Sequence, residues 1–187
     1  QTDYIDLYQL HNPRIDTIEK DEVFETLEEL VAEGKIRYYG VALGPDIGWF
    51  EEGEAAMKFR DVPTLQIIYS ILEQEPARRF FPIADEENTG PMTRVPHASG
   101  LLDGTYSRDT VLDPDDHRSR RKTEWLERGL SKLERLDFLT ENLTSTIGQI
   151  AIKFALSGPM VASVLLTTTK EPQLREFAAA PDVEEIP

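Results

Sequence analysis

The sequence predicts an α/β fold in which parallel strands alternate with helices. Apolar, β-branched stretches begin near residues 4, 36, 64, 92 and 161, and each is followed by a segment with apolar residues at helical spacing. The first four stretches recur every 28 to 32 residues, about the length of a βαβ unit. Such alternation is typical of a parallel sheet with right-handed crossovers.

Each element follows from its pattern and its boundary signals. Gly34 ends the first long helix, and Ser145 or Thr146 caps the helix that begins at 147. Residues 99–120 follow neither period and form an irregular loop insertion, which in compact domains is more often functional than accidental. The predicted strands are 4–10, 35–43, 64–71, 92–95 and 161–166, and the predicted helices are 19–33, 49–59, 76–87, 122–136, 147–156 and 171–179.

The first strand delivers a histidine to its C-terminal end. We interpret residues 4–10 as a buried strand that stops at His11, because Pro13 cannot continue a central strand. In parallel α/β folds, ligands bind outside the carboxyl ends of the strands, so His11 is a candidate site residue. The alternative is a histidine that only caps the strand or bonds a nearby carbonyl.

Two further stretches carry polar residues at informative places. Gln66 lies inside an otherwise apolar strand, and an unpaired buried amide costs about 1–3 kcal/mol, so it has either a backbone partner or a ligand. Arg94, His97 and the Ser-Gly pair at 99–100 follow the fourth strand. Their charges and backbone N–H groups are suited to cradle a phosphate.

The amino-acid composition limits which binding partners and which cellular compartment we expect for the protein. The chain has no cysteine, which excludes disulfides, thiol nucleophiles and cysteine metal sites and fits a cytoplasmic protein. We predict no metal-binding residues. The net charge of -15 disfavours nucleic acid, and we interpret the basic cluster 118–122 as a solvated helix start. No apolar run is long enough to cross a membrane, and we expect no membrane partner.

The number of units leaves two topologies open. Five strand–helix units fall short of the eight that close a (β/α)8 barrel, and five parallel strands also suit an open doubly wound sheet that folds by itself. No glycine-rich phosphate fingerprint follows the first strand, which disfavours a Rossmann-type fold. Because the chain opens on Gln1 with a strand close behind it, we expect that it enters a domain part-way.

Several motifs together resemble one known family. The stretch DYIDLYQLH at 3–11 resembles the fourth-strand motif of the aldo-keto reductases, and GKIRYYGV at 34–41 resembles their fifth. Further matches follow in the family's order, and they are LQIIYS at 65–70, RVPHASGLLDGTY at 94–106, IAIKFAL at 150–156 and QL at 173–174. The resemblance covers nearly the whole chain. It implies the C-terminal part of a single (β/α)8 TIM barrel, strands four to eight.

The resemblance also implies an activity. Aldo-keto reductases transfer hydride from NADPH to an aldehyde or ketone carbonyl with a tetrad of Asp, Tyr, Lys and His, and His11 falls on the histidine. The other three members belong to earlier strands, so we expect the 187 residues alone to be inactive. The partner expected for the whole barrel is a small carbonyl compound.

The resemblance also implies which residues contact the cofactor. The resemblance places Gln66 at the nicotinamide carboxamide and Arg94 at the nicotinamide ring. It places the adenosine 2′-phosphate by Thr167 and Lys170, and the adenine by Glu176. The segment expected to line the pyrophosphate with its backbone comprises Val95, Pro96, His97, Ala98, Ser99 and Gly100.

Departures from the family pattern keep alternatives open. Relative to the family pattern, Ala42 and Leu43 replace two hydrogen-bonding residues, and Thr167 replaces a usual glycine. We therefore expect weak, altered or absent NADPH binding, with NADH as the alternative cofactor. A second interpretation is therefore a non-catalytic barrel that binds a nucleotide or a protein, like the potassium-channel β subunits. The first and last strands are both expected to be exposed edges that invite self-association.

Overall fold

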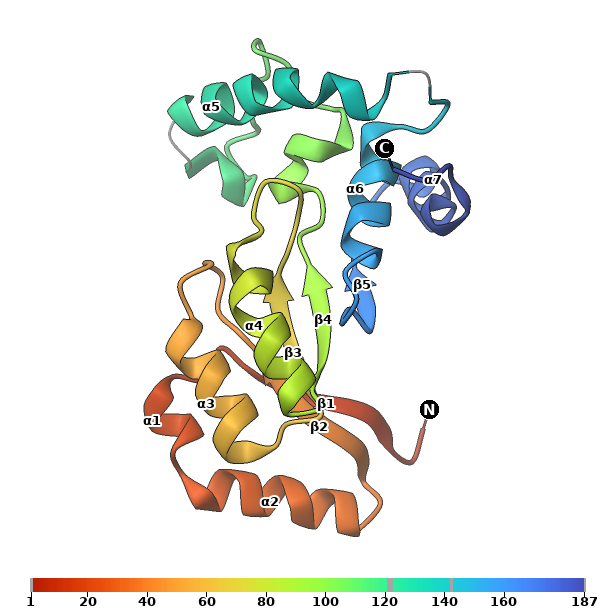
Figure 1. The fold of residues 1–187 in the computed structure, drawn as a ribbon. Coiled ribbons are helices and arrows are strands. Elements are labelled where there is room, and N and C mark those ends of the chain that lie inside the picture. The colour runs from red at the N-terminus through yellow and green to blue at the C-terminus, as the bar shows by residue number, and fades with distance from the viewer. Residues whose placement is uncertain (1, 121–122, 142, 187) are drawn as a thin grey trace. The chain divides into compact units, whose positions relative to one another are not determined.

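The computed structural model describes residues 2–120, 123–141 and 143–186. Five parallel strands form one sheet in chain order, β1-β2-β3-β4-β5 (Figure 1). All five predicted strands are therefore present and pair in parallel, as expected. Their bounds are β1 (Ile5–His11), β2 (Ile36–Ala42), β3 (Thr64–Ile68), β4 (Gly90–Arg94) and β5 (Ser163–Leu165).

The described residues divide into two compact units. The sheet unit comprises the chain up to Tyr69, Glu73–Arg94 and Pro159–Leu165. The helical unit comprises Ser70–Leu72, Val95–Gly158 and the chain from Leu166 onward.

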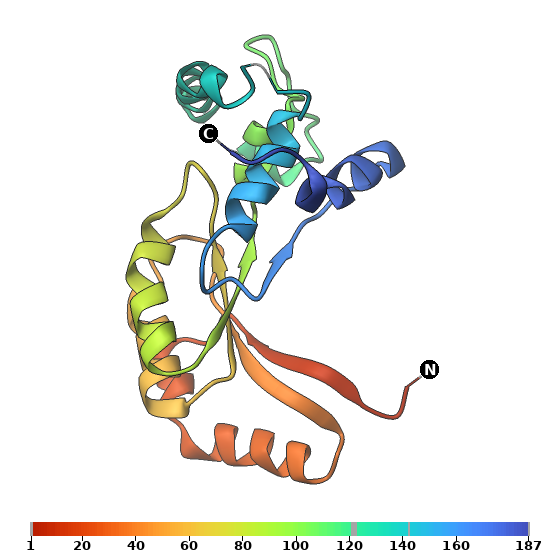
Figure 2. The same cartoon turned by 45° about the vertical axis from the view of Figure 1, so that its right-hand side comes forward.

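Helices of the sheet unit lie on one face of the sheet (Figure 2). The row that faces them, Val41, Leu65 and Ile67, is at most 1% exposed, because alternate strand residues point to the same side. Phe24 of α2 meets Tyr39 of β2 edge-on, with 6.3 Å between ring centroids. The helices are α1 (Ile15–Ile18), α2 (Asp21–Ala32), α3 (Phe50–Arg60) and α4 (Glu75–Glu86).

The predicted helix 19–33 is present as α2, and a short helix that the sequence did not predict, α1, precedes it. The backbone of Lys20 is extended, with φ -79° and ψ 114°, so α1 stops before α2 begins. Arg60, at the end of α3, donates from Nε to the carbonyl of Ile18 at 2.6 Å and pairs with Asp21 at 2.7 Å, which fixes this break. At the other end of α2, Gly34 adopts φ +71° as the predicted helix stop.

The two outer strands, β1 and β5, are exposed edges of the sheet, as expected. This position corrects the separate prediction that the first strand is buried. Strand β1 is not buried, since its residues Ile5 and Tyr8 are each more than two-fifths exposed. The physical reason is that, among the described residues, β1 pairs with β2 alone and no strand lies along its other side. The apolar composition of the stretch indicated a strand but not its place in the sheet. Strand β5, at the opposite edge, has only three residues.

Helices make up the regular structure of the helical unit. Leu101, Leu102, Leu126, Leu130 and Ala151 form its larger apolar cluster. Thr146 caps α6, with its hydroxyl accepting from the backbone of Gln149 at 3.2 Å, which confirms one of the two predicted caps. Residues 104–116 contain no helix or strand. The elements are η1 (Ala98–Asp103), η2 (His117–Arg120), α5 (Thr123–Leu133), η3 (Glu134–Leu139), α6 (Ile147–Leu156), α7 (Glu171–Ala178) and η4 (Ala180–Asp182).

Two kinds of special environment are absent from the described residues. None of their helices is both long and apolar enough to cross a bilayer. They also contain no cluster of three or more acidic, histidine or cysteine side chains suited to hold a metal ion. Two members of the basic cluster 118–122, residues 121 and 122, lie outside the described part of the chain.

Candidate functional site

Strand register aligns two of the predicted site residues in the sheet unit. His11 is the last residue of β1 and pairs with Ala42, which in turn pairs with Gln66 on β3. One strand therefore separates His11 from Gln66, a backbone spacing of about 10 Å. The His11 side chain is exposed. Asn12 ends the strand with φ +53°, and its N–H donates to the carbonyl of Ala42 at 2.8 Å.

The side chain of Gln66 is hydrogen-bonded to another side chain. The sequence suggests either a backbone group or a ligand as its partner. Its Nε2 donates to Oε1 of Gln9 on β1 at 2.9 Å. Among the described residues, Oε1 of Gln66 accepts no hydrogen bond, and Nε2 of Gln9 is buried without a partner. The two amides thus leave one acceptor and one donor for another group.

Arg94, the last residue of β4, reaches across the end of the sheet. Its Nη2 donates to the carbonyl of Gly44 at 2.6 Å and to that of Leu43 at 3.2 Å. Burial lowers the pKa of the Arg94 guanidinium, and Glu73 raises it. The arginine therefore holds the loop after β2, where Ala42 and Leu43 are buried.

Sequence reasoning missed a cluster on the loops that follow β1 and β2. The indole of Trp49 packs on Gly44, where an added Cβ would come within 1.7 Å of the ring. The guanidinium of Arg14 lies 4.4 Å from the centre of the same indole and pairs at 3.1 Å with Glu52, which is 4% exposed. These contacts join separate segments, so no local pattern signals them.

In the helical unit, the segment 95–100 is strained. Val95, Ala98 and Ser99 have positive φ, as does Gly100, and such angles are rare for residues with a side chain. Strained backbone clusters at ligand sites, because the surrounding structure must enforce it. A Cβ at Gly100 would come within 2.9 Å of both Arg118 Nη1 and Tyr106 Oη. The segment therefore has an unusual backbone, and its assignment to the pyrophosphate stays a prediction.

The imidazole of His97 faces inward. It is 8% exposed, its Nε2 lies 3.1 Å from the carbonyl of Gly148, and its ring centre is 4.2 Å from that of Phe177. Burial lowers the pKa of His97, while the bond to Gly148 and the nearby acids Asp103 and Glu176 raise it. The His97 side chain therefore packs inside the helical unit, and Pro96 beside it is also buried.

The predicted adenosine residues lie around the start of α7. Thr167 and Lys170 are exposed, and none of the ion pairs between described residues involves Lys170. Glu176 accepts from the hydroxyl of Thr146 at 2.5 Å, and its backbone carbonyl accepts from Gln149 Nε2 at 3.0 Å. The Glu176 carboxylate is therefore held against the cap of α6.

The predicted site residues divide between the units. The sheet unit holds His11, Gln66 and Arg94 at the carboxyl edge of the sheet, where α/β folds bind ligands. The helical unit contains the residues assigned to the pyrophosphate and the adenosine, and within it α6 connects the loop at His97 to α7. The fold is that of a parallel α/β domain, in which two of the predicted site residues, His11 and Gln66, lie in register at one end of the sheet.

Comparison with known proteins then identifies the family. A model of the Aldo/keto reductase family matches residues 1–186, and the chain belongs to that family. It is 30% identical over 190 residues to the uncharacterized oxidoreductase YqkF of Bacillus subtilis, covering 100% of this chain and 58% of the relative. It is 29% identical over 185 residues to an NADH-specific methylglyoxal reductase of Escherichia coli, covering 95% and 54%.

Solved structures agree with this assignment. The holo form of the aldo-keto reductase AKR11C1 from Bacillus halodurans superimposes with a TM-score of 0.69 at 28% identity, over 100% of this chain and 58% of that one. The relatives are (β/α)8 barrels, so the prediction of a partial barrel with five strand–helix units is confirmed. The chain spans little more than half the length of the relatives that it matches.

Proposed function

We propose that the protein is a nicotinamide-dependent oxidoreductase that reduces an aldehyde or ketone, the carbonyl substrate being a small molecule. The observation that carries the proposal is the row of His11, Ala42 and Gln66 at the carboxyl edge of the sheet. NADPH or NADH, when bound, supplies the hydride. Gln66 fits the carboxamide of the nicotinamide, because an amide side chain with an uncommitted oxygen accepts from an amide N–H.

His11 orients the carbonyl in this proposal. Its exposed imidazole at the end of β1 donates a hydrogen bond to the substrate oxygen, where negative charge develops as hydride arrives. The Asp, Tyr and Lys that complete the family's tetrad match no position of this chain. We therefore propose that the 187 residues by themselves are inactive.

The test of the reaction uses the protein in its full natural length. Oxidation of NADPH or NADH by a simple aldehyde is followed by nicotinamide absorbance for the wild type and for His11→Ala. We expect kcat to fall at least about 100-fold in the variant, the usual scale of a lost acid–base or orienting group. Thr26→Ala, an exposed change on α2, is the control and should retain wild-type turnover. Unchanged turnover in His11→Ala would contradict the role of His11.

The choice between NADPH and NADH is proposed to depend on Lys170. Its exposed ammonium group, at the start of α7, suits the adenosine 2′-phosphate that only NADPH carries. Lys170→Ala should raise the dissociation constant of NADPH about tenfold, the scale of one hydrogen bond to a charged group. The dissociation constant of NADH should stay the same. An equal change for both nucleotides would overturn this assignment.

The second candidate function is a barrel that binds a nucleotide or a protein without turnover. Ala42, Leu43 and Thr167 favour it, because each replaces a residue that the family uses for the cofactor. Tight nucleotide binding with no aldehyde-dependent oxidation would select this function. We also propose a cytoplasmic location, from the absence of cysteine, and self-association through the edges β1 and β5 where nothing covers them.

A further inference from the structure

The pair Gln9 and Gln66 bridges two strands across a third. Gln9 pairs with Gly40 of β2, and Gly40 pairs with Thr64 of β3, two residues before Gln66. All four lie on the same side of the sheet, because alternate residues share a face. An added Cβ at Gly40 would come 2.1 Å from Thr64 Oγ1. Since Gly40 has no side chain, the space above β2 is open to the two amides.

One hydrogen bond couples the orientations of both amides. Gln9 Oε1 accepts from Gln66 Nε2, so Gln66 directs its Nε2 at β1 and keeps its own Oε1 for another partner. If Gln66 turned over alone, two acceptor oxygens would face each other. The acceptor on Gln9 therefore determines which atom Gln66 presents.

The remaining polar atoms of this cluster are unpaired. Gln9 Nε2 and Thr64 Oγ1 are buried and have no partner, and they are two of the three such side-chain atoms among the described residues. Buried polar atoms are paired in most proteins, and exceptions occur where a ligand or water completes the set. The cluster is therefore built for a polar group that comes from outside the chain.

We propose that Gln9 is a positioning residue for the nicotinamide cofactor. It holds Gln66 so that Oε1 of Gln66 accepts from the N–H of the carboxamide. The inference rests on the proposed function, and it adds a residue that touches Gln66 and not the cofactor. It gives Gln9 a role that its place in an apolar edge strand does not explain.

The test compares natural cofactors with an analogue that cannot donate. In 3-acetylpyridine dinucleotides a methyl group replaces the carboxamide NH2. Dissociation constants of the reduced natural and analogue forms are measured by fluorescence for the full-length wild type and for Gln9→Met. We expect Gln9→Met to weaken binding of the natural cofactor about three- to tenfold, the scale of one neutral hydrogen bond. The analogue should bind both proteins within twofold, because it never made that bond.

Three further variants separate positioning from folding. Gln9→Glu keeps the acceptor for Gln66 Nε2 and should restore the wild-type preference for the natural cofactor over the analogue. Gln9→Asn keeps an amide, but its side chain is one methylene too short to reach Gln66. It should therefore weaken binding of the natural cofactor as Gln9→Met does, and it serves as the second variant if Gln9→Met folds poorly. Tyr8→Phe, on the opposite face of β1, is the matched control and should change neither constant.

The outcomes distinguish the inference from the function on which it rests. If the wild type binds neither reduced nucleotide, both are overturned. If the wild type binds them, and Gln9→Met weakens binding of the natural cofactor and of the analogue by the same factor, the oxidoreductase proposal stands and the positioning role is overturned. The positioning role is also overturned if Gln9→Met and Gln9→Asn bind the natural cofactor as tightly as the wild type.

Discussion

The Nη2 atom of Arg94 donates to the carbonyl of Gly44 at 2.6 Å and so connects the end of β4 to the loop after β2. The same nitrogen also reaches the carbonyl of Leu43 at 3.2 Å. One half-buried cation thus satisfies two backbone oxygens at the carboxyl edge of the sheet. Since Trp49 packs on Gly44, the arginine also supports the indole that Arg14 covers.

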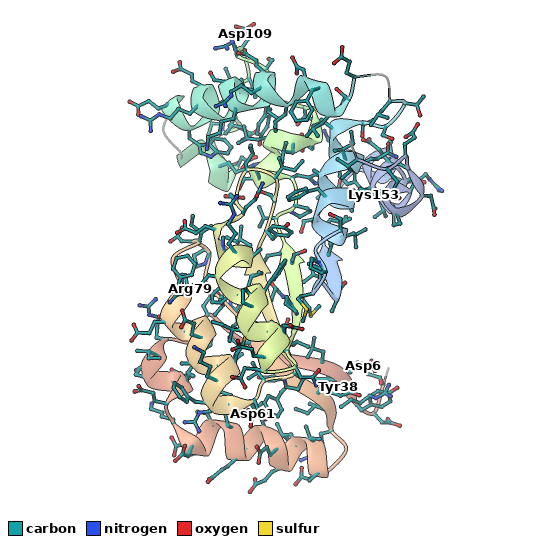
Figure 3. The ribbon with its side chains drawn as sticks, viewed as in Figure 1. Asp6, Tyr38, Asp61, Arg79, Asp109 and Lys153 are labelled. Atoms are coloured by element: carbon teal, nitrogen blue, oxygen red, sulfur yellow. The ribbon has the colours of Figure 1, made fainter. Side chains whose placement is uncertain are left out.

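Replacing this arginine should destabilise the protein. We expect Arg94→Met to lower the free energy of unfolding by about 1.5–3 kcal/mol, because hydrogen bonds from a charged donor are lost and two carbonyls are left unpaired. Urea denaturation measures the change. Arg79→Met on α4 is the control, since Arg79 is exposed and its ion pair with Glu54 lies on the surface (Figure 3). It should cost less than about 1 kcal/mol. Equal losses in both variants would contradict the bracing role of Arg94.

Gly40 should not tolerate a side chain. A Cβ there would lie 2.1 Å from Thr64 Oγ1 and 2.6 Å from the Thr64 carbonyl oxygen, and the backbone atom cannot turn away. We expect Gly40→Ala to lower the free energy of unfolding by about 1–3 kcal/mol, the usual cost of overpacking. Gly48→Ala, with nothing within 4 Å of the added Cβ, should change it by less than about 1 kcal/mol in either direction. Thermal or urea unfolding of both variants tests the contrast.

Much of the fold is readable from the sequence because its signals are local. The buried row at Val41, Leu65 and Ile67 follows from apolar strand residues, and the stop at Gly34 from its freedom to adopt positive φ. The cap at Thr146 follows from its hydroxyl. The exposure of β1 could not be read from its composition, because the same apolar residues suit a central and an edge strand. Its edge position followed from the resemblance to the fourth strand of a barrel.

The candidate site was only partly readable for a related reason. His11 and Gln66 stand out as polar residues at a strand end and within an apolar strand. Gln9 carries the same signal as Gln66 and was available to the same argument, but its pairing needs the register across β2. The inward imidazole of His97 depends on Gly148, far away in the sequence, so no local pattern predicts it.

Burial of His97 should make stability depend on pH. Because the pKa of His97 is lowered in the folded protein, the unfolded chain binds the proton first as the pH falls below about 6.5. The free energy of unfolding should therefore be highest above this pH and decrease below it. His97→Gln should lose this pH-dependent part of the free energy of unfolding, while it retains a side-chain donor for the Gly148 carbonyl. Unfolding midpoints measured between pH 5 and 7.5 test this, and parallel profiles for both proteins would contradict it.

The C-terminal segment should be held by an acid that stays charged to low pH. Glu184 accepts from the hydroxyl of Thr144 at 2.6 Å and from that of Ser145. Lys153, which is labelled on α6 in Figure 3, donates to the carbonyl of Pro181 at 3.0 Å. The Ser145 and Thr144 hydroxyls lower the pKa of Glu184 to about 2 from an ordinary 4.5. Because the folded pKa is lowered, the contact stabilises the fold above about pH 4.5 and is lost as the pH falls through 2.

The titration of the Glu184 carboxylate can be measured directly by NMR, by following its carboxyl resonance between about pH 2 and pH 4.5. The double variant Thr144→Ala and Ser145→Ala should move the Glu184 midpoint up toward 4.5, since both hydroxyl donors are then absent. Ser157→Ala, which removes an exposed hydroxyl bonded to Phe154 at the other end of α6, should leave the midpoint in place. A Glu184 midpoint near 4.5 in the wild type would show that the hydroxyl contacts do not hold the carboxylate in solution.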